Sequence, residues 1–328
     1  MLEDSYGRRI NYLRLAVTDR CNLRCAYCMP AEGLNWLPGK ELMTYEEMLR
    51  ICSLFVTMGV EKIRITGGEP FVRKELLPFL KNLSQINGVQ ELTLTTNGVL
   101  TAPFIPGLKE IGINTVNLSL DTLNRERFIQ ITHRDELDNV LESLQSFLHH
   151  DFEVKINAVV MEGLNIEDMI PLVELTKSLP IAVRFIEEMP FNGESHQVTL
   201  HWNAQRILEH IQGRFPNIKK IIDTPHSTSY NFHIPGHKGN VGIIAAYSRS
   251  FCGTCNRIRI TPTGVLRTCL YDNGKLNIKS ALREGKKDEV LKSMVTQAIL
   301  KKAENGWETE KARDRHEPAH ESMATIGG

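Results

Sequence analysis

Three cysteines near the N-terminus have the spacing expected of ligands to one metal cluster. Cys21, Cys25 and Cys28 are separated by three and then two residues. Because the loop is short, it can wrap three thiolates around an iron–sulfur cube and leave the fourth iron free to bind a substrate. A zinc site with a distant fourth ligand is the nearest metal alternative, and three unrelated thiols are the remaining one.

A second group of three cysteines lies in the last third of the chain. Cys252 and Cys255 are separated by two residues, and Cys269 follows after thirteen more. A compact loop could close these thiols on a metal, and we expect a second cluster with an open iron. A structural zinc site with three cysteines and one histidine is the alternative. The candidate histidines are His226, His233 and His237.

The residues between these thiols add two cations. In Arg257-Ile258-Arg259, the alternation of a strand would point both guanidinium groups to one face, beside the expected metal. A planar fork of donors suits phosphate oxygens, which favours a phosphate-bearing ligand. The other interpretation is that the two cations only offset the negative charge of a cluster.

Composition limits the classes of function. The 328-residue chain has 39 Lys and Arg against 39 Asp and Glu, so its overall charge predicts no nucleic-acid and no membrane partner. Residues 1–10 lack an apolar leader core, and no run of about 18 apolar residues follows, so we expect neither secretion nor membrane spanning. Six of the seven cysteines fall in the two triplets, which favours metal ligation in a reducing compartment. The expected location is cytoplasmic.

Most of the chain alternates predicted strands with helical segments. This alternation predicts an α/β fold with a parallel sheet, left open or curled into a partial TIM barrel of about six βα units. After about residue 200 the rhythm changes, so we expect a core domain, residues 1–225, and a smaller C-terminal extension, residues 226–328, that carries the second triplet. The expected strands are 12–17, 62–66, 91–96, 115–120, 153–160 and 181–187.

The expected strands have one apolar and one polar face. If helices cover the apolar faces, the polar faces line the inside of the curve, where ordinary barrels pack branched aliphatic side chains. Cations buried there need carboxylates or an anionic ligand, and a phosphate-bearing ligand meets that need. A flat antiparallel sheet with one solvated face is the alternative. The polar residues of these strands include Arg14, Arg64, Thr95, Ser119, Lys155 and Arg184.

Two motifs together point to a family. The first triplet, with Tyr27 before its last cysteine, resembles the CxxxCxxC signature of radical S-adenosylmethionine (SAM) enzymes. By itself the Gly67-Gly68 pair indicates only a turn, but with Glu69 and Pro70 it is similar to the GGEP motif of the same enzymes. The resemblance implies a [4Fe–4S] cluster whose open iron chelates SAM, with Glu69 placed to hold the SAM amino group.

The arrangement of both triplets resembles one branch of this family, the radical SAM lyases that cyclise GTP in the first step of molybdenum cofactor biosynthesis. The resemblance rests on the first triplet, the run CGTCNRIRITPTGVLRTCL at residues 252–270, and the final Ile326-Gly327-Gly328. It implies two [4Fe–4S] clusters, of which the second contacts the guanine, and the product (8S)-3′,8-cyclo-7,8-dihydroguanosine 5′-triphosphate. It also implies an external one-electron reductant, a cyclic pyranopterin monophosphate synthase that receives the product, and a monomer or homodimer.

The same resemblance assigns individual residues. SAM contacts are expected from Tyr27, Gly68, Ser119 and Met189. GTP contacts are expected from Arg14, Arg64, Thr95, Lys155, Arg257, Ile258 and Arg259. Gly327 and Gly328 are expected to reach into the active site. The strongly charged segment 305–322 departs from the family pattern, because Glu321-Ser322 stands where we expect an arginine, so the path of the tail is left open.

Two other functions stay open. Peptide-modifying radical SAM enzymes also carry extra clusters in a C-terminal extension, but Arg257, Arg259 and the final glycines favour GTP. A zinc protein that binds nucleic acid or a partner is the other alternative, and the balanced charge weighs against it.

Overall fold

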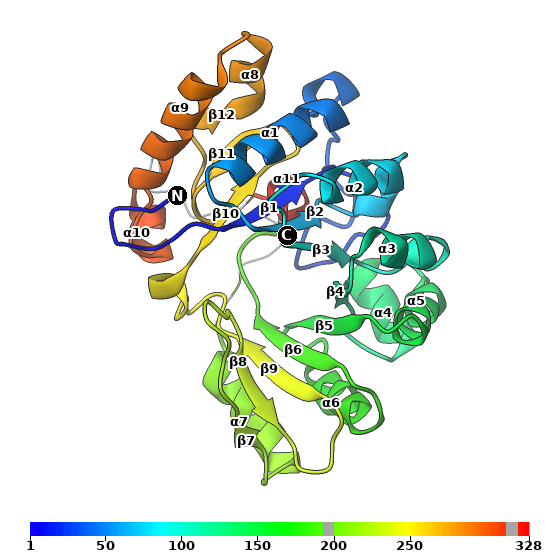
Figure 1. Ribbon diagram of the computed structural model, residues 1–328. Coiled ribbons are helices and arrows are strands. Elements are labelled where there is room, and N and C mark those ends of the chain that lie inside the picture. Colours follow the sequence, from blue (N-terminus) through cyan, green and yellow to red (C-terminus); the bar gives the residue numbers. More distant parts are fainter. Residues whose placement is uncertain (193–197, 199, 313–320, 328) are drawn as a thin grey trace.

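The computed structural model describes residues 1–192, 198, 200–312 and 321–327. Its core is a curved sheet whose first six strands are parallel and are connected by helices (Figure 1). The six expected strands are confirmed, and their ends agree to within one residue. They are β1 (Tyr12–Ala16), β2 (Lys62–Thr66), β3 (Glu91–Thr96), β4 (Thr115–Ser119), β5 (Glu153–Val160) and β6 (Ala182–Glu187).

Helices cover the outer face of this sheet (Figure 1). The first begins with the capping box that the sequence predicts, because Glu47 N donates to Thr44 Oγ1 at 3.2 Å and Thr44 N donates to Glu47 Oε2 at 2.8 Å. The outer helices are α1 (Tyr45–Thr57), α2 (Leu76–Ser84), α3 (Ile105–Ile111), α4 (Arg125–Thr132), α5 (Leu137–His149) and α6 (Met169–Ser178). Short 3₁₀ turns span Gly39–Glu41, Pro70–Val72, Ala102–Phe104, Ile166–Asp168 and Cys252–Thr254.

Residues after about 200 extend the sheet at both edges. One edge adds β7 (Lys219–Lys220), β8 (Tyr230–His233) and β9 (Asn240–Ile244), and the other adds β10 (Arg257–Ile260), β11 (Val265–Arg267) and β12 (Leu276–Asn277). The helices of this part are α7 (Ala204–Arg214), α8 (Ile278–Arg283), α9 (Asp288–Leu300) and α10 (Gly306–Lys311). The strand order is β12-β11-β10-β1-β2-β3-β4-β5-β6-β9-β8-β7. Because β9 and β10 are parallel to their neighbours β6 and β1, the extension continues the partial barrel instead of forming a sheet of its own.

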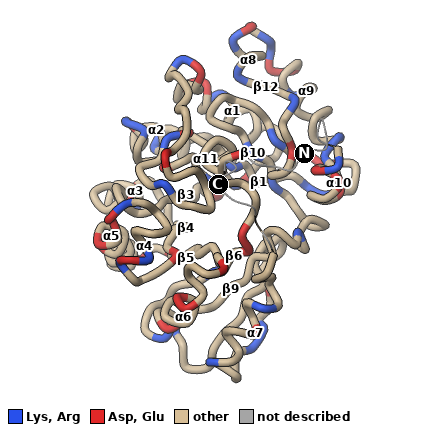
Figure 2. Tube along the Cα trace, turned by 180° about the vertical axis from the view of Figure 1, so that it is seen from behind, with Lys and Arg blue, Asp and Glu red and all other residues tan. Residues whose placement is uncertain are grey.

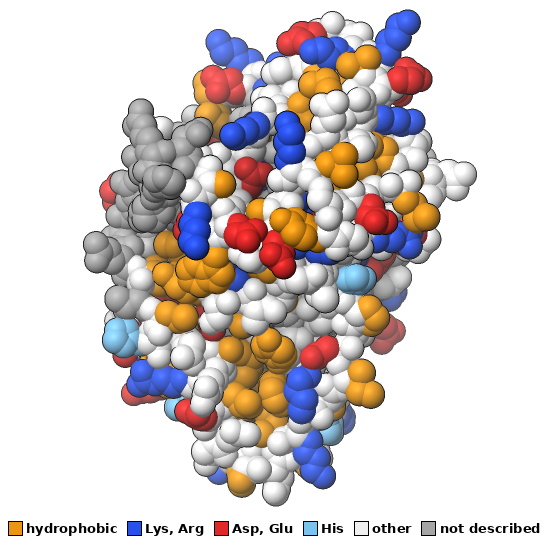
Figure 3. Space-filling view, turned by 90° about the vertical axis from the view of Figure 1, so that its left-hand side faces the viewer, with side chains coloured by type: hydrophobic (Ala, Val, Ile, Leu, Met, Phe, Trp, Pro, Cys, Tyr) orange, Lys and Arg blue, Asp and Glu red, His pale blue; other side chains and the backbone are white. Residues whose placement is uncertain are grey.

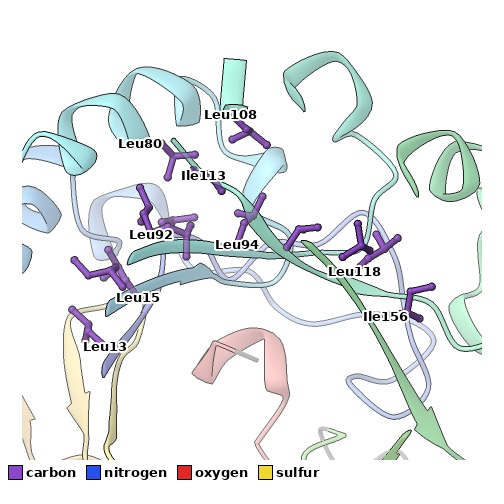
Figure 4. Close-up of a cluster of buried hydrophobic side chains, with 14 of the residues drawn as sticks. Leu13, Leu15, Leu80, Leu92, Leu94, Leu108, Ile113, Leu118 and Ile156 are labelled. Carbon is purple, nitrogen blue, oxygen red and sulfur yellow. The ribbon is translucent and has the colours of Figure 1, made fainter. Parts of the chain in front are cut away.

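The main core lies between the sheet and the outer helices. Leu13 and Leu15 of β1 and Leu94 of β3 point toward the same layer as Leu80 of α2 and Leu108 of α3 (Figure 4). All five are buried. Complete burial of one such side chain stabilises the fold by about 1.5–3 kcal/mol, so this layer fixes which face of each strand turns outward.

The opposite face of the strands carries polar side chains into the curve. Arg14 of β1 lies in register with Arg64 of β2 on one side and with Arg259 of β10 on the other. Farther along the sheet, Asn117 of β4 is in register with Lys155 of β5. Register partners in a parallel pair point to the same face, so the predicted polar interior is confirmed.

The C-terminal segment lies inside this curve. A short helix, α11 (Met323–Ile326), is on the side of the sheet opposite the buried leucines (Figure 4). Met323 N donates to Phe191 O at 3.0 Å, and Ile326 packs with Phe191 and Tyr271 in a small apolar cluster separate from the main core. These contacts place the tail beside the polar strand faces.

Charged residues of both signs are distributed over the molecule. Lysines, arginines and acidic residues alternate along the outer elements in Figure 2, and the face in Figure 3 mixes both charges with hydrophobic side chains. Among the helices that the structure describes, none has the length and apolar character needed to cross a membrane.

Candidate active site

The first cysteine triplet lies on the loop that follows β1. Cys28 N and Met29 N both donate to Cys25 O, at 2.8 and 3.0 Å, so the loop turns tightly around the middle cysteine. Arg24 N and Ala26 N donate to carbonyls at the end of α4, each at 2.9 Å. These bonds attach the loop to a rigid helix and hold its thiols at the carboxyl ends of the strands.

A cavity of about 190 Å³ opens beside this triplet. All three thiols line it. The four predicted SAM residues also line it, together with Thr95, which was predicted to contact GTP. The structure therefore brings together, around one space, the residues Cys21, Cys25, Cys28, Tyr27, Gly68, Thr95, Ser119 and Met189.

The Gly67-Gly68 pair is required by a close approach of two loops. A Cβ atom on Gly68 would lie 2.3 Å from Arg20 O, and one on Gly67 would lie 2.6 Å from Thr18 O. Gly68 N donates to Thr18 O at 2.9 Å, which joins the loop after β2 to the end of β1. Side chains at this pair would push the two loops apart and widen the cavity.

Glu69 holds the loops around this cavity together through hydrogen bonds. It is completely buried, and its carboxylate accepts from Phe71 N, Thr96 Oγ1 and Asn97 N at 3.1, 2.9 and 2.7 Å. Burial raises the pKa of Glu69 to about 7. Asn97 in turn places its amide nitrogen 3.7 Å from Cys21 Sγ, so Glu69 orients a neighbour of the first triplet.

Tyr27 is also held by a buried carboxylate. Its hydroxyl donates to Asp121 Oδ2 at 3.0 Å, and Asp121 Oδ1 accepts from Val159 N at 2.8 Å. Burial raises the pKa of Asp121 to about 7. Alternation along the sequence places Asp121 on the same polar face as Asn117 and Ser119, but it assigns this residue no role.

The donor set of this cavity fits the group that the family implies. Within the described part of the chain, Thr66 Oγ1 and Asn157 Oδ1 line the cavity and are buried without a hydrogen-bond partner, as expected where a polar ligand binds. Burial, with Glu69 nearby, raises the pKa of the Cys21 thiol to about 12. Ligation to iron replaces those thiol protons, so the three cysteines can hold a cluster here.

The described residues contain no group of three His, Cys, Asp or Glu side chains close enough to hold a single metal ion. A cluster cube does not require such convergence, because its thiolates bind separate iron atoms. Two of the three candidate zinc histidines bond to residues outside the second triplet: His233 Nδ1 lies 3.1 Å from Asn240 Oδ1 and His237 Nδ1 lies 2.7 Å from Thr176 Oγ1. His226 lies beside the triplet, with Nδ1 2.9 Å from Thr254 O between Cys252 and Cys255.

The second triplet lies at the β10 edge of the sheet. Cys252 begins a 3₁₀ turn whose hydrogen bond runs from Cys255 N to Cys252 O at 3.1 Å, and Cys269 follows β11. Burial acts to raise the pKa of the Cys255 thiol, but Lys302 and Arg257 outweigh it and lower that pKa to about 6. These three thiols therefore lie among cations.

A second cavity, of about 400 Å³, adjoins this region. Four of the predicted GTP residues line it, together with Tyr12, Arg184 and the polar loop 224–229. The carboxylates of Glu61 and Glu91 and the ammonium group of Lys62 also lie in its wall. Burial lowers the pKa of Arg14 to about 10, and Arg64 and Arg257 act in the same direction. The four predicted residues are Arg14, Arg64, Lys155 and Arg257.

Only part of this positive charge is neutralised by ion pairs among the described residues. Lys155 Nζ pairs with Glu153 Oε1 at 2.7 Å. Among the described residues no carboxylate forms an ion pair with Arg14, Arg64 or Arg184. Buried charges without partners are costly, so this cavity is built for an anionic ligand.

The remaining GTP and tail residues meet between the two cavities. Arg259 donates to Gly327 O, so the tail reaches the polar strand faces. Ile258 has its side chain buried on the opposite face of β10, and only its backbone could contact a ligand there. Glu321, which stands where an arginine was expected, accepts two hydrogen bonds from Arg267 of β11, at 2.8 and 3.1 Å. Gly328 lies outside the described residues, as do residues 313–320.

Two protein-family models match this chain. The model of the Radical SAM superfamily matches residues 15–176, and the model of the Molybdenum Cofactor Synthesis C family matches residues 181–307. The radical SAM family implies a [4Fe–4S] cluster and SAM. Crystal structures support the fold: that of Streptococcus suis SuiB bound to S-adenosylmethionine has a TM-score of 0.65 over 96% of this chain and 76% of that one, at 16% identity.

Relatives at higher identity define the branch. A GTP 3′,8-cyclase of Alkaliphilus oremlandii is 39% identical over all of this chain and all of its own length. The mitochondrial GTP 3′,8-cyclase of Arabidopsis thaliana is 40% identical over all of this chain and 84% of its own. The chain spans about half the length of several relatives named molybdenum cofactor biosynthesis protein 1. The chain belongs to the GTP 3′,8-cyclase family of radical SAM enzymes.

Proposed function

We propose that this protein is a radical SAM lyase that converts GTP to (8S)-3′,8-cyclo-7,8-dihydroguanosine 5′-triphosphate, the first step of molybdenum cofactor biosynthesis. The observation that carries the proposal is the pairing of two spaces inside one curved sheet. One is lined by the first triplet and the predicted SAM residues. The other is lined by several cations, of which Arg14, Arg64 and Arg184 form no ion pair among the described residues. Family membership supports the same reaction, because the relatives bear its name.

The first triplet and its cavity hold SAM and its cluster in this proposal. When bound, a [4Fe–4S] cluster held by Cys21, Cys25 and Cys28 would supply the electron for reductive cleavage of SAM, whose deoxyadenosyl part would accept the hydrogen lost from C3′ of GTP. Formation of the C3′–C8 bond of the 7,8-dihydro product would then need one further electron and one proton, which the external reductant and solvent would supply. The backbone at Gly68 and the side chains of Tyr27, Ser119 and Met189 hold SAM. Asp121 and Glu69 keep the walls of that cavity in place through the hydrogen bonds described above. Apolar wall residues such as Val159 exclude water from the site.

The second triplet and the cations orient GTP. Cys252, Cys255 and Cys269 would hold a second [4Fe–4S] cluster, which would supply an iron to bind the guanine. The triphosphate then lies against the guanidinium and ammonium groups of the larger cavity, which offer bidentate and point-charge contacts to its oxygens. Thr95, in the SAM cavity, contacts the sugar side of GTP. This arrangement turns C3′ toward SAM, so the protein's contribution to the rate is orientation.

The remaining predictions extend this proposal beyond the chain. An external one-electron reductant serves the first cluster, and a cyclic pyranopterin monophosphate synthase receives the product. The protein works in the cytoplasm as a monomer or homodimer. Residues 1–225 carry radical generation, and residues 226–328 carry the second cluster and the final Gly-Gly.

Anaerobic turnover tests the proposal. The reconstituted protein, incubated with SAM, dithionite and GTP, should form 5′-deoxyadenosine and a cyclised GTP isomer that mass spectrometry identifies. Iron and sulfide should approach about eight of each per chain, the number in two [4Fe–4S] clusters. SAM cleavage without loss of GTP would favour the peptide-modifying alternative, and zinc without sulfide would overturn the radical mechanism.

A further inference from the structure

Basic side chains from two distant segments grip the backbone of the second triplet. Arg8, near the N-terminus, donates to Cys252 O at 2.9 Å. Lys302, just after α9, donates to Arg257 O at 3.3 Å and also to Thr268 O. The three acceptor carbonyls are those of Cys252, Arg257 and Thr268. Each belongs to one cysteine of the triplet or lies within two residues of one, so the backbone is held near all three thiols.

Arg8 also holds the segment that carries Lys302. Arg8 donates to Ala303 O at 2.7 Å and to Glu304 O at 2.5 Å, directly after Lys302. Its Nε is fixed by Asp4 Oδ2 at 2.6 Å. Arg8 is 8% exposed and Lys302 is 4% exposed, so these bonds do not compete with bulk water. The result is one connected clamp, formed by Asp4, Arg8 and Lys302, around the triplet loop.

The ammonium group of Lys302 is buried and, among the described residues, forms no ion pair with a carboxylate. Its Nζ lies 3.9 Å from Cys255 Sγ, within hydrogen-bond distance of that sulfur. A buried ammonium is costly without a partner, and a sulfur ligand of a negatively charged cluster would be such a partner.

We propose that Arg8 and Lys302 are positioning residues that hold the second cysteine triplet in its cluster-binding shape before iron arrives, and that Lys302 then donates to the sulfur of Cys255. The inference rests on the proposed second cluster for its final step only. Because hydrogen bonds to the sulfurs and nearby charge set the potential of an iron–sulfur cluster, Lys302 favours the reduced, more negative state of that cluster.

The clamp can be tested in the full-length chain isolated without iron. Lys302→Met and Arg8→Met remove the donors and keep most of the side-chain volume. Hydrogen–deuterium exchange of peptides covering residues 250–270 should become about tenfold faster in both variants. The matched controls are Lys301→Met and Arg9→Met, at neighbouring exposed positions, and they should exchange like the unsubstituted protein. Unchanged exchange in peptides covering residues 20–30 shows that the core remains folded.

The cluster provides a second readout. After reconstitution, Lys302→Met should hold about four iron ions per chain and the unsubstituted protein about eight. Lys302→Gln, which keeps a neutral donor, should retain part of the second cluster, and its reduction potential by electron paramagnetic resonance titration should be lower than in the unsubstituted protein.

The outcomes separate this inference from the proposed function. Unchanged exchange in both Met variants, or equal acceleration in the Lys301 control, overturns the clamp. If the unsubstituted protein binds only about four iron ions, the second cluster is wrong, and the exchange data still decide whether the clamp shapes the loop. A potential that does not fall in Lys302→Gln overturns the bond to Cys255.

Discussion

The two cysteine triplets have the same number of thiols but different electrostatic surroundings. The acidic groups Glu69 and Asp121 act on the first, whereas Lys302 and Arg257 act on the second. Negative neighbours disfavour the reduced state of a cluster, and positive neighbours favour it. A cluster held by the first triplet would therefore have the lower reduction potential and be the stronger electron donor of the two, and the cations around the second triplet would also suit an anionic ligand.

The largest expected difference comes from removing one thiol at each site. Cys25→Ala should abolish 5′-deoxyadenosine formation, because the cluster that cleaves SAM loses a ligand. Cys255→Ala should keep reductive SAM cleavage and lose GTP cyclisation. Both products are measured by liquid chromatography and mass spectrometry. If Cys25→Ala still releases 5′-deoxyadenosine, the division of labour between the triplets is wrong.

The cations beside the second triplet should come next in effect. Combined substitution of Arg257 and Arg259 by Ala should weaken GTP binding at least about a hundredfold, since each charge-assisted hydrogen bond contributes about 1.5–3 kcal/mol. Reductive SAM cleavage should persist. Anaerobic calorimetry measures the affinity, and Arg283→Ala, at an exposed arginine paired with Glu47, is the control. Unchanged GTP affinity would remove β10 from the substrate site.

A smaller change tests the first site. Tyr27→Phe removes the donor to Asp121 and should raise the KM for SAM about fivefold, the effect of losing roughly 1 kcal/mol. The iron content and the affinity for GTP should not change. Steady-state kinetics with SAM as the varied substrate provide the check, and an effect on GTP affinity instead would contradict the assignment of Tyr27.

The smallest expected effect concerns the tail. Glu321→Gln weakens the ion pair between Glu321 and Arg267. Because the Glu321 side chain is 36% exposed, the loss of interaction free energy should stay below about 1 kcal/mol. We expect at most an approximately fivefold rise in the KM for GTP and unchanged SAM cleavage. A loss of cyclisation as large as that of Cys255→Ala would show that this pair, and not the second triplet alone, controls the substrate end.

Local pattern was enough to predict the framework of this molecule. Alternation along single strands placed Arg14 and Lys155 on the concave face, because side-chain direction in a strand is set by neighbouring residues. The first triplet was also predictable from local sequence, because Cys21, Cys25 and Cys28 lie within eight consecutive residues. Met189 had no such signal, and its prediction depended on the resemblance alone, although the structure places it at the SAM cavity.

The residues that the sequence did not reveal depend on contacts between distant segments. Arg8 and Cys252 are separated by 244 positions, and Lys302 and Arg257 by 45. No periodicity relates such pairs. The joining of β9 and β10 to opposite edges of the sheet was also unpredicted, because these strands are only five and four residues long and their partners lie far away in sequence.

The C-terminal extension pairs with both outer strands of the six-stranded sheet, and this affects how the chain folds. Until β10 and β9 form, β1 and β6 are edge strands with unpaired backbone donors and acceptors, which are templates for pairing with other chains. A truncation after Glu187 should therefore aggregate even though it retains the first triplet and six complete strands. The extension that carries the second triplet is therefore also expected to protect the nascent barrel from self-association during synthesis.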